Sequence, residues 1–297
     1  MSGFGIREVS AVRQEIIDLY DEFTHRGLDR RVFMNRLVEL AGGTTAAAAA
    51  LSALRADPAS AAQVAADDPR VTTESVVIGA EGSKLKGYLA RPAGNTGKLP
   101  GVVVVHENRG LNPHIEDVTR RLGAEGFMAL APDFLSSVGG TPQNEDEARN
   151  MIGKLDPNEV VKEATTALDW LKMRPDSNGK AGIIGFCWGG GVVGRVAVAD
   201  PELDAGVVFY GQAPPADQVP NIEAPLLLHY AGLDERINAG VPAFEKALQD
   251  SGKTFELHRY EGVNHAFHND TSAARYDEAA AKLAWSRTID FLRRHLA

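Results

Sequence analysis

The pentapeptide Gly185-Phe186-Cys187-Trp188-Gly189 restricts the possible folds of this chain more than any other stretch. It follows the apolar run 181–184 and precedes residues 190–199, which we predict to be helical. A strand, a sharp turn and a helix with a nucleophilic residue at the turn match the G-x-S-x-G nucleophile elbow, with cysteine in the serine position. Glycine suits both ends of the pentapeptide because the strand and the helix pass close to each other beside a strained turn.

Two other interpretations of this stretch have to be weighed. A lone cysteine is commonly a buried core residue without chemistry. In addition, Gly189, Gly191 and Gly194 spell G-x-G-x-x-G after a strand, which is typical of dinucleotide binding. That pattern requires an acidic residue at the end of the next strand, but the next candidate strand, 206–210, is followed by Gly211. The dinucleotide interpretation is therefore disfavoured.

The bulk composition excludes several classes of protein. A length of 297 residues fits one large α/β domain, or one domain with an extension. Acidic residues outnumber basic ones by 40 to 31, which argues against a nucleic-acid partner. A single cysteine allows no intramolecular disulfide, and no run of 18 apolar residues predicts a membrane span. We therefore expect a soluble, cytoplasmic protein with no membrane partner.

The pair Arg30-Arg31 raises an alternative for the location of the protein. Followed by an Ala-, Gly- and Thr-rich stretch, the pair resembles a twin-arginine export signal. Against this, Glu39 interrupts the apolar part, and Asp29 stands where Ser or Thr is usual. We favour a helix that is capped by Asp29. The side chains expected on its apolar face are Phe33, Leu37, Leu40 and Ala41.

The first 70 residues are predicted to be a helical N-terminal extension. Apolar residues recur at helical spacing over 10–25, a second helix runs to Gly42-Gly43, and a third covers 46–56. The segment 57–70 reads as a linker. No catalytic constellation is visible here, so we expect the extension to pack against the main domain or to form a homo-oligomer through its helices.

Residues 71–297 are predicted to form an α/β domain. Strands at 71–78 and 85–91 are expected to pair as an antiparallel hairpin. After them strands and helices alternate, which indicates a doubly wound, mostly parallel sheet. The further strands are expected at 101–105, 127–131, 181–184, 205–210, 225–230 and 255–260, and the helices at 115–125, 145–152, 159–173, 190–199, 242–249 and 273–295.

The chain also supplies partners for a cysteine nucleophile. A free thiol has a pKa near 8.5, so it needs a base, and the base needs an orienting carboxylate. Asp234 follows the strand 225–230, and His265 follows the strand 255–260. The order nucleophile, acid, histidine is that of α/β-hydrolases. We expect both residues at the same sheet edge as Cys187, where open α/β sheets place their sites.

A metal site is the alternative for the histidine. His265 could pair with His268 and Asp270, but their spacing matches none of the helical zinc motifs. We therefore expect neither a metal nor a cofactor.

Several motifs taken together resemble the dienelactone hydrolase (carboxymethylenebutenolidase) family. The resemblance covers about residues 71–297, and the helical extension marks a subgroup of larger members. The motifs that carry it are Gly185-Phe186-Cys187-Trp188-Gly189-Gly190, His106-Glu107-Asn108-Arg109-Gly110-Leu111-Asn112, Ala131-Pro132-Asp133 and His265-Ala266-Phe267-His268.

The resemblance implies an α/β-hydrolase fold and a Cys-Asp-His triad of Cys187, Asp234 and His265. It also implies that Glu107 contacts the resting thiol and takes part in activating it when substrate arrives. A carboxylate beside the sulfur would disfavour a second negative charge, which keeps the resting thiol neutral. The implied function is hydrolysis of a small ester or lactone. The alternative is a non-catalytic binding or scaffolding protein on a hydrolase fold.

The resemblance also implies an oxyanion hole, made by the backbone N–H groups of Trp188 and Asn108.

This chain departs from the family pattern at one position that concerns the substrate. The family holds a substrate carboxylate with arginines, one of them four residues after the histidine, where this chain has Asn269. Dienelactone itself is therefore in doubt as the substrate. The candidate replacements are Arg109, Arg149 and Arg236.

Overall fold

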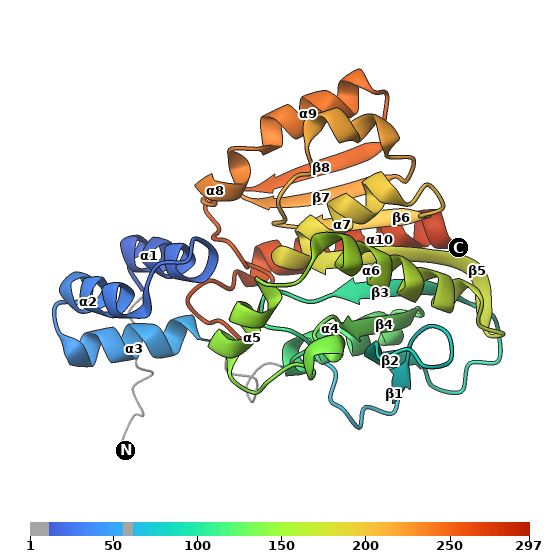
Figure 1. The fold of residues 1–297 in the computed structure, drawn as a ribbon, viewed down its shortest axis with the longest axis horizontal. Coiled ribbons are helices and arrows are strands. Elements are labelled where there is room, and N and C mark those ends of the chain that lie inside the picture. The colour runs from blue at the N-terminus through green and yellow to red at the C-terminus, as the bar shows by residue number, and fades with distance from the viewer. Residues whose placement is uncertain (1–11, 56–61) are drawn as a thin grey trace, which may run out of the picture.

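The computed structural model describes residues 12–55 and 62–297, which contain an eight-stranded sheet with helices on both faces (Figure 1). The strand order is β1-β2-β4-β3-β5-β6-β7-β8. The strands are β1 (Val71–Val77), β2 (Lys86–Pro92), β3 (Leu99–Val105), β4 (Met128–Asp133), β5 (Ser177–Phe186), β6 (Ala205–Phe209), β7 (Leu226–Ala231) and β8 (Phe255–Tyr260).

Only β2 runs opposite to the other strands. β1 and β2 form the predicted hairpin, with Val71 opposite Pro92, and β2 pairs antiparallel with β4. From β4 to β8 every neighbouring pair is parallel. The consecutive valines 102–105 of β3 are fully buried, as expected of a strand covered on both faces. The predicted fold class is confirmed.

The helices form two layers, one on each face of the sheet, and each layer packs on its own apolar core. On one face, the core contains residues of α6, α7 and α9, and on the other it contains residues of α4 and α10. The helices of this part of the chain are α4 (Pro113–Ala124), α5 (Glu145–Ile152), α6 (Pro157–Lys172), α7 (Trp188–Ala199), α8 (Glu235–Asn238), α9 (Val241–Asp250) and α10 (Glu278–Leu296).

Most predicted boundaries are within two residues of the observed ones, and the larger differences are two boundaries and one additional helix. The last helix begins at Glu278 rather than at 273, because the side chain of Asp277 accepts a hydrogen bond from the backbone N–H of Ala280 and caps it. β5 begins four residues earlier than expected, at Ser177. The four-residue helix α8 was not predicted, and its N-cap is Asp234.

The N-terminal extension contains three helices with a common apolar core: α1 (Gln14–His25), α2 (Arg30–Ala41) and α3 (Thr44–Leu54). The side chain of Asp29 accepts from the backbone N–H groups of Arg31 and Val32, so the predicted cap forms. Phe33 and Leu37 are buried, and Phe33 stacks on Phe23 with 4.3 Å between the ring centroids. The predicted start of the first helix, at residues 10 and 11, lies outside the described residues.

None of the described helices is by itself long and apolar enough to cross a membrane. α2 and α3 pass that test only as a pair, and the chain bends by 111° between them.

The three helices dock on the sheet domain (Figure 1). The backbone N–H of Ala274 donates to Ala53 O (3.1 Å), and Arg275 forms an ion pair with Asp21 (3.3 Å). The described part of the predicted linker is also held, since the N–H of Val64 donates to Asp117 at 2.8 Å. Docking against the main domain is therefore observed, whereas oligomerisation stays a prediction.

Candidate active site

Cys187 occupies the apex of a strained turn between β5 and α7. Its backbone angles are φ 55° and ψ −113°, a combination that non-glycine residues rarely adopt. Its N–H donates to Phe209 O of the neighbouring strand at 3.0 Å, which ties the turn to the sheet. Such strain persists only where the surrounding structure enforces it, and it concentrates at functional sites.

The two glycines of the pentapeptide are required by close backbone contacts. A Cβ atom on Gly185 would lie 2.2 Å from Gly189 O, and one on Gly189 would lie 2.4 Å from Val105 O. Both distances are far below any normal carbon–oxygen contact. The spacing of glycines that identified the elbow thus reflects the packing of β5, α7 and β3 against one another.

His265 and Asp234 form a buried pair beside the elbow. Nδ1 of His265 lies 2.5 Å from Oδ2 of Asp234, while Oδ1 of Asp234 accepts from the N–H of Ile237. Burial lowers the pKa of His265, but Asp234 and the sulfur of Cys187 raise it, and the net value is about 10. Burial raises the pKa of Asp234, yet His265 and Arg236 lower it below its ordinary value.

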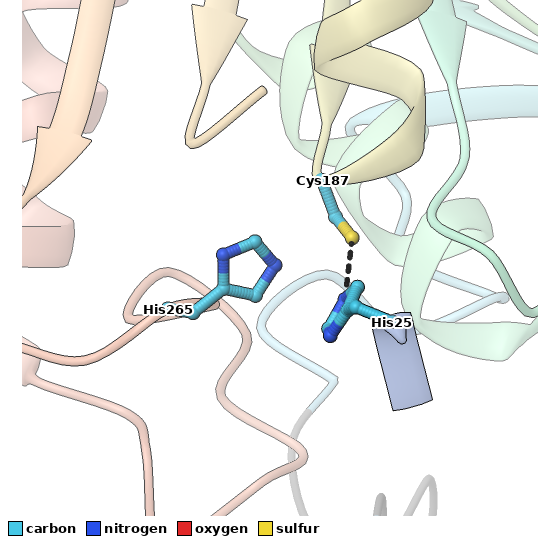
Figure 2. A group of neighbouring side chains, drawn as sticks. All are labelled: His25, Cys187 and His265. Carbon is cyan, nitrogen blue, oxygen red and sulfur yellow. Dashed lines mark hydrogen bonds between the residues drawn. The ribbon is translucent and has the colours of Figure 1, made fainter. Parts of the chain in front are cut away.

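A third side chain, which the sequence did not reveal, reaches the thiol. His25 is the last residue of α1, and its Nε2 lies 3.2 Å from Sγ of Cys187 (Figure 2). His25, Cys187 and His265 each place one nitrogen or sulfur atom in a cluster, and these three atoms all lie within 4.8 Å of one another. His25 and Cys187 are 162 positions apart in the chain, and no motif surrounds His25. Only the docking of α1 brings the two side chains together.

The charge state of His25 follows from its surroundings. Its Nδ1 lies 3.0 Å from the carbonyl oxygen of Asp21, which can only accept, so Nδ1 carries the hydrogen. Burial, followed by the charge of nearby His265, lowers the pKa of His25 well below its usual value. The imidazole is therefore neutral, and its Nε2 presents a lone pair to the thiol.

The sulfur faces a small cavity of about 250 Å³ between α1 and the sheet edge. Three arginines and no carboxylate line it. Arg149 is paired with Asp146 at 3.1 Å, so the positive charge of the cavity comes mainly from Arg195 and Arg236. The residues that line the cavity are Thr24, His25, Asn108, Arg149, Ile152, Gly153, Cys187, Trp188, Gly191, Arg195, Gln212, Arg236 and Ile237.

Two of the three candidate substrate-binding arginines line the cavity, and the third does not. Arg149 and Arg236 line the cavity. Arg109 does not, because its guanidinium pairs with Glu145 and donates to the hydroxyl of Tyr20 at 2.6 Å. Arg195, which the sequence did not single out, lines the cavity as well.

The two residues expected to provide oxyanion donors both border the cavity. Trp188 is the first residue of α7, so its N–H has no acceptor within the helix. Its indole stacks on His106 with 5.2 Å between the centroids. The side chain of Asn108 donates to Thr24 O at 3.1 Å, which links this loop to α1.

Glu107 is buried, but its hydrogen-bond partner differs from the one expected. Nδ2 of Asn269 donates to Oε2 of Glu107 at 2.7 Å. Among the described residues no hydrogen bond joins Glu107 to Cys187, whose thiol contacts His25 instead.

The alternative grouping of His265 with His268 and Asp270 is not formed. Asp270 binds His114 (3.2 Å) and Arg121 (2.5 Å), and His268 stacks on Phe186.

A strained nucleophile elbow at the carboxyl edge of a doubly wound sheet, followed in chain order by an acid and a histidine, defines an α/β hydrolase. A family model described as "Dienelactone hydrolase family" matches residues 85–296. The chain belongs to the dienelactone hydrolase family.

Individual relatives agree with this assignment. The chain is 34% identical over 262 residues to the "Putative carboxymethylenebutenolidase" of Saccharolobus solfataricus, covering 74% of this chain and 98% of that protein. It is 34% identical over 248 residues to the "Probable 2-oxo-3-(5-oxofuran-2-ylidene)propanoate lactonase" of Bradyrhizobium sp, covering 76% and 96%. The crystal structure of a "Putative Dienelactone Hydrolase" from Klebsiella pneumoniae is similar with a TM-score of 0.69 at 29% identity, covering 75% and 99%.

Proposed function

We propose that this protein hydrolyses small esters or lactones through a covalent intermediate on Cys187. The observation that carries the proposal is Cys187, which lines a cavity from the apex of a strained turn, with the buried His265–Asp234 pair beside it. The names of the relatives, a carboxymethylenebutenolidase and a lactonase, support the same reaction class.

In the first step the thiol gives its proton to Nε2 of His265, and Asp234, bonded to Nδ1, stabilises the charged imidazole that forms. The sulfur then attacks the carbonyl carbon, and the carbon–oxygen bond of the ester breaks. His265 gives its proton to the departing alkoxide. In a lactone this alkoxide stays attached to the acyl group.

The second step releases the acyl group. His265, neutral again, accepts a proton from a water molecule whose oxygen attacks the thioester carbonyl. The carbon–sulfur bond breaks, and the proton returns to the sulfur. Asp234 holds the ring of His265 in one orientation and stabilises its charged form throughout. The N–H groups of Trp188 and Asn108 are the proposed donors to the negative oxygen of each tetrahedral intermediate.

The lining of the cavity favours a substrate that carries a carboxylate. Arg149, Arg195 and Arg236 border it with no acidic side chain among the lining residues. Guanidinium groups bind carboxylates through paired, charge-assisted hydrogen bonds. The volume of about 250 Å³ suits a small acid rather than a long-chain ester.

The test is the turnover of p-nitrophenyl acetate by Cys187→Ala and Asp234→Asn. Removing a triad nucleophile costs on the order of 10⁶ in kcat, while removing the orienting acid costs on the order of 10⁴. We expect Cys187→Ala to be the more damaging change, with unchanged near-UV circular dichroism as the control for folding. Turnover of Cys187→Ala within tenfold of the wild type would exclude the mechanism. A wild-type protein inactive on every ester and lactone tested would favour the binding role instead.

A further inference from the structure

The cluster of His25, Cys187 and His265 has the composition of a soft-metal site (Figure 2). Two imidazole nitrogens and one sulfur are ligands that Zn²⁺ prefers, and three protein ligands leave a fourth position open. In a tetrahedral zinc site, neighbouring ligand atoms are about 3.5 Å apart, given Zn–N near 2.0 Å and Zn–S near 2.3 Å. The separation of 3.2 Å between Nε2 of His25 and Sγ of Cys187 is close to this value, and all three atoms lie within 4.8 Å of one another.

In both histidines Nδ1 is bonded to an oxygen acceptor, which leaves Nε2 to face the metal. Nδ1 of His265 is engaged by Asp234, and Nδ1 of His25 donates to the carbonyl oxygen of Asp21. The hydroxyl of Thr24, 2.9 Å from the same Nδ1, itself donates to Tyr20 O. Metal-binding histidines in proteins characteristically bond their second nitrogen to a carboxylate or a backbone carbonyl in this way.

The free nitrogen of His265 provides a separate indication. Its Nε2 is buried and has no hydrogen-bond partner among the described residues. A buried polar atom without a partner is costly, and a bound group would satisfy it. Figure 2 shows a ring nitrogen of His265 directed toward the space between Cys187 and His25.

We propose that Nε2 of His25, Sγ of Cys187 and Nε2 of His265 bind one Zn²⁺ ion, and that this ion inhibits the enzyme reversibly. Binding forms two Zn–N bonds and one Zn–S bond, and the thiol loses its proton to solvent, with no change in oxidation state. The inhibition rests on the proposed function, because the ion occupies the sulfur that attacks and the nitrogen that accepts its proton. The binding itself does not depend on that function.

The site needs both the N-terminal extension and the sheet domain, because His25 lies in α1. The other two ligands belong to the part matched by the family model, whereas His25 comes from α1, outside it. A family member without such a helix would retain only two of the three ligands. Inhibition by zinc is therefore expected to depend on the N-terminal extension.

The binding test uses Co²⁺ as a visible substitute for Zn²⁺ in the full-length protein after treatment with a chelator. We expect one Co²⁺ per chain, with sulfur-to-cobalt absorption in the near ultraviolet and the visible bands of a tetrahedral site, all abolished by one equivalent of Zn²⁺. Cys187→Ala should remove the sulfur band. His25→Ala and the bulkier His25→Gln should each weaken Co²⁺ binding at least about tenfold, whereas His295→Ala, a histidine outside the cluster, should not.

The inhibition test measures turnover of p-nitrophenyl acetate against buffered free Zn²⁺, with recovery in chelator. We expect the inhibition constant to rise at least about tenfold in both His25 variants, measured relative to the activity of each variant without metal. Absence of the sulfur band in the wild type, or equal Co²⁺ affinity in the wild type and both His25 variants, would overturn the site. If the chelated wild type is inactive but the band is present, the proposed function fails while the metal site stands.

Discussion

Asn269 donates a hydrogen bond from its amide nitrogen to the buried carboxylate of Glu107, with 2.7 Å between the atoms. Its amide oxygen accepts from both the N–H and the hydroxyl of Thr271. Asn269 is therefore committed to the interior, and it is not among the residues that line the cavity. The residue at this position supports Glu107, while the positive charge near the thiol comes from arginines on other elements.

The hydrogen bond from Asn269 to Glu107 predicts that Asn269→Leu lowers the stability of the protein. The substitution leaves the buried carboxylate of Glu107 without its donor, and an unsatisfied buried polar group costs about 1–3 kcal/mol. We expect the free energy of unfolding in urea to fall by this amount. Asn150→Leu, at an exposed position of α5, serves as the control and should change it by less than about 0.5 kcal/mol. Equal effects of the two substitutions would contradict the assignment.

The His265–Asp234 pair predicts how stability depends on pH. The folded-state pKa of His265 is about 10, above the unfolded value of about 6.5, so its contribution is complete below pH 6.5 and is lost as the pH rises toward 10. The loss cannot exceed about 1.4 kcal/mol per pH unit for one proton. Urea unfolding at pH 6 and pH 9.5 should show the difference between the wild type and His265→Gln shrinking at the higher pH. A constant difference would argue against a charged His265.

The elbow predicts contrasting effects of two glycine substitutions. In Gly189→Ala the new methyl group would lie 2.4 Å from Val105 O and 2.6 Å from His106 O, so the backbone of the turn must shift. A displacement of about 1 Å at a reacting group costs roughly 100-fold in rate, and we expect at least that loss in kcat/KM. In Gly97→Ala, away from the cavity, the nearest atom is at 3.8 Å, an ordinary contact, and activity should remain within threefold. Similar kinetics for both variants would show that the turn tolerates side chains.

The cationic cavity predicts a charge-specific effect of Arg236→Gln. Mono-p-nitrophenyl succinate carries a carboxylate, and p-nitrophenyl butyrate is a neutral ester of similar size. Since hydrogen bonds to charged groups contribute about 1.5–3 kcal/mol, we expect KM for the succinate ester to rise about tenfold or more. KM for the butyrate ester should hardly change. Arg259→Gln, exposed on β8, is the matched control. A parallel rise for both esters would show that Arg236 shapes the cavity without recognising charge.

Much of the architecture could be predicted because its determinants are local. The valine run of β3, the glycines of the elbow and the Asp29 cap each specify a short element through neighbouring residues. The alternation of strands and helices then fixed the parallel part of the sheet, and with it the edge at which Cys187, Asp234 and His265 would lie. Where boundaries were wrong, as at the start of α10, the deciding contact was a cap beyond the apolar pattern.

The elbow, the chain order of Cys187, Asp234 and His265, and the family could all be recognised from the amino-acid sequence. Only the tertiary structure decided that His25 meets the thiol, that Asn269 serves Glu107 and that Arg195 joins the cavity. Turns and caps depend on residues a few positions apart, so they can be recognised in the sequence. The position of a docked helix depends on apolar packing between segments far apart in the chain. Such packing produces no motif around a residue like His25.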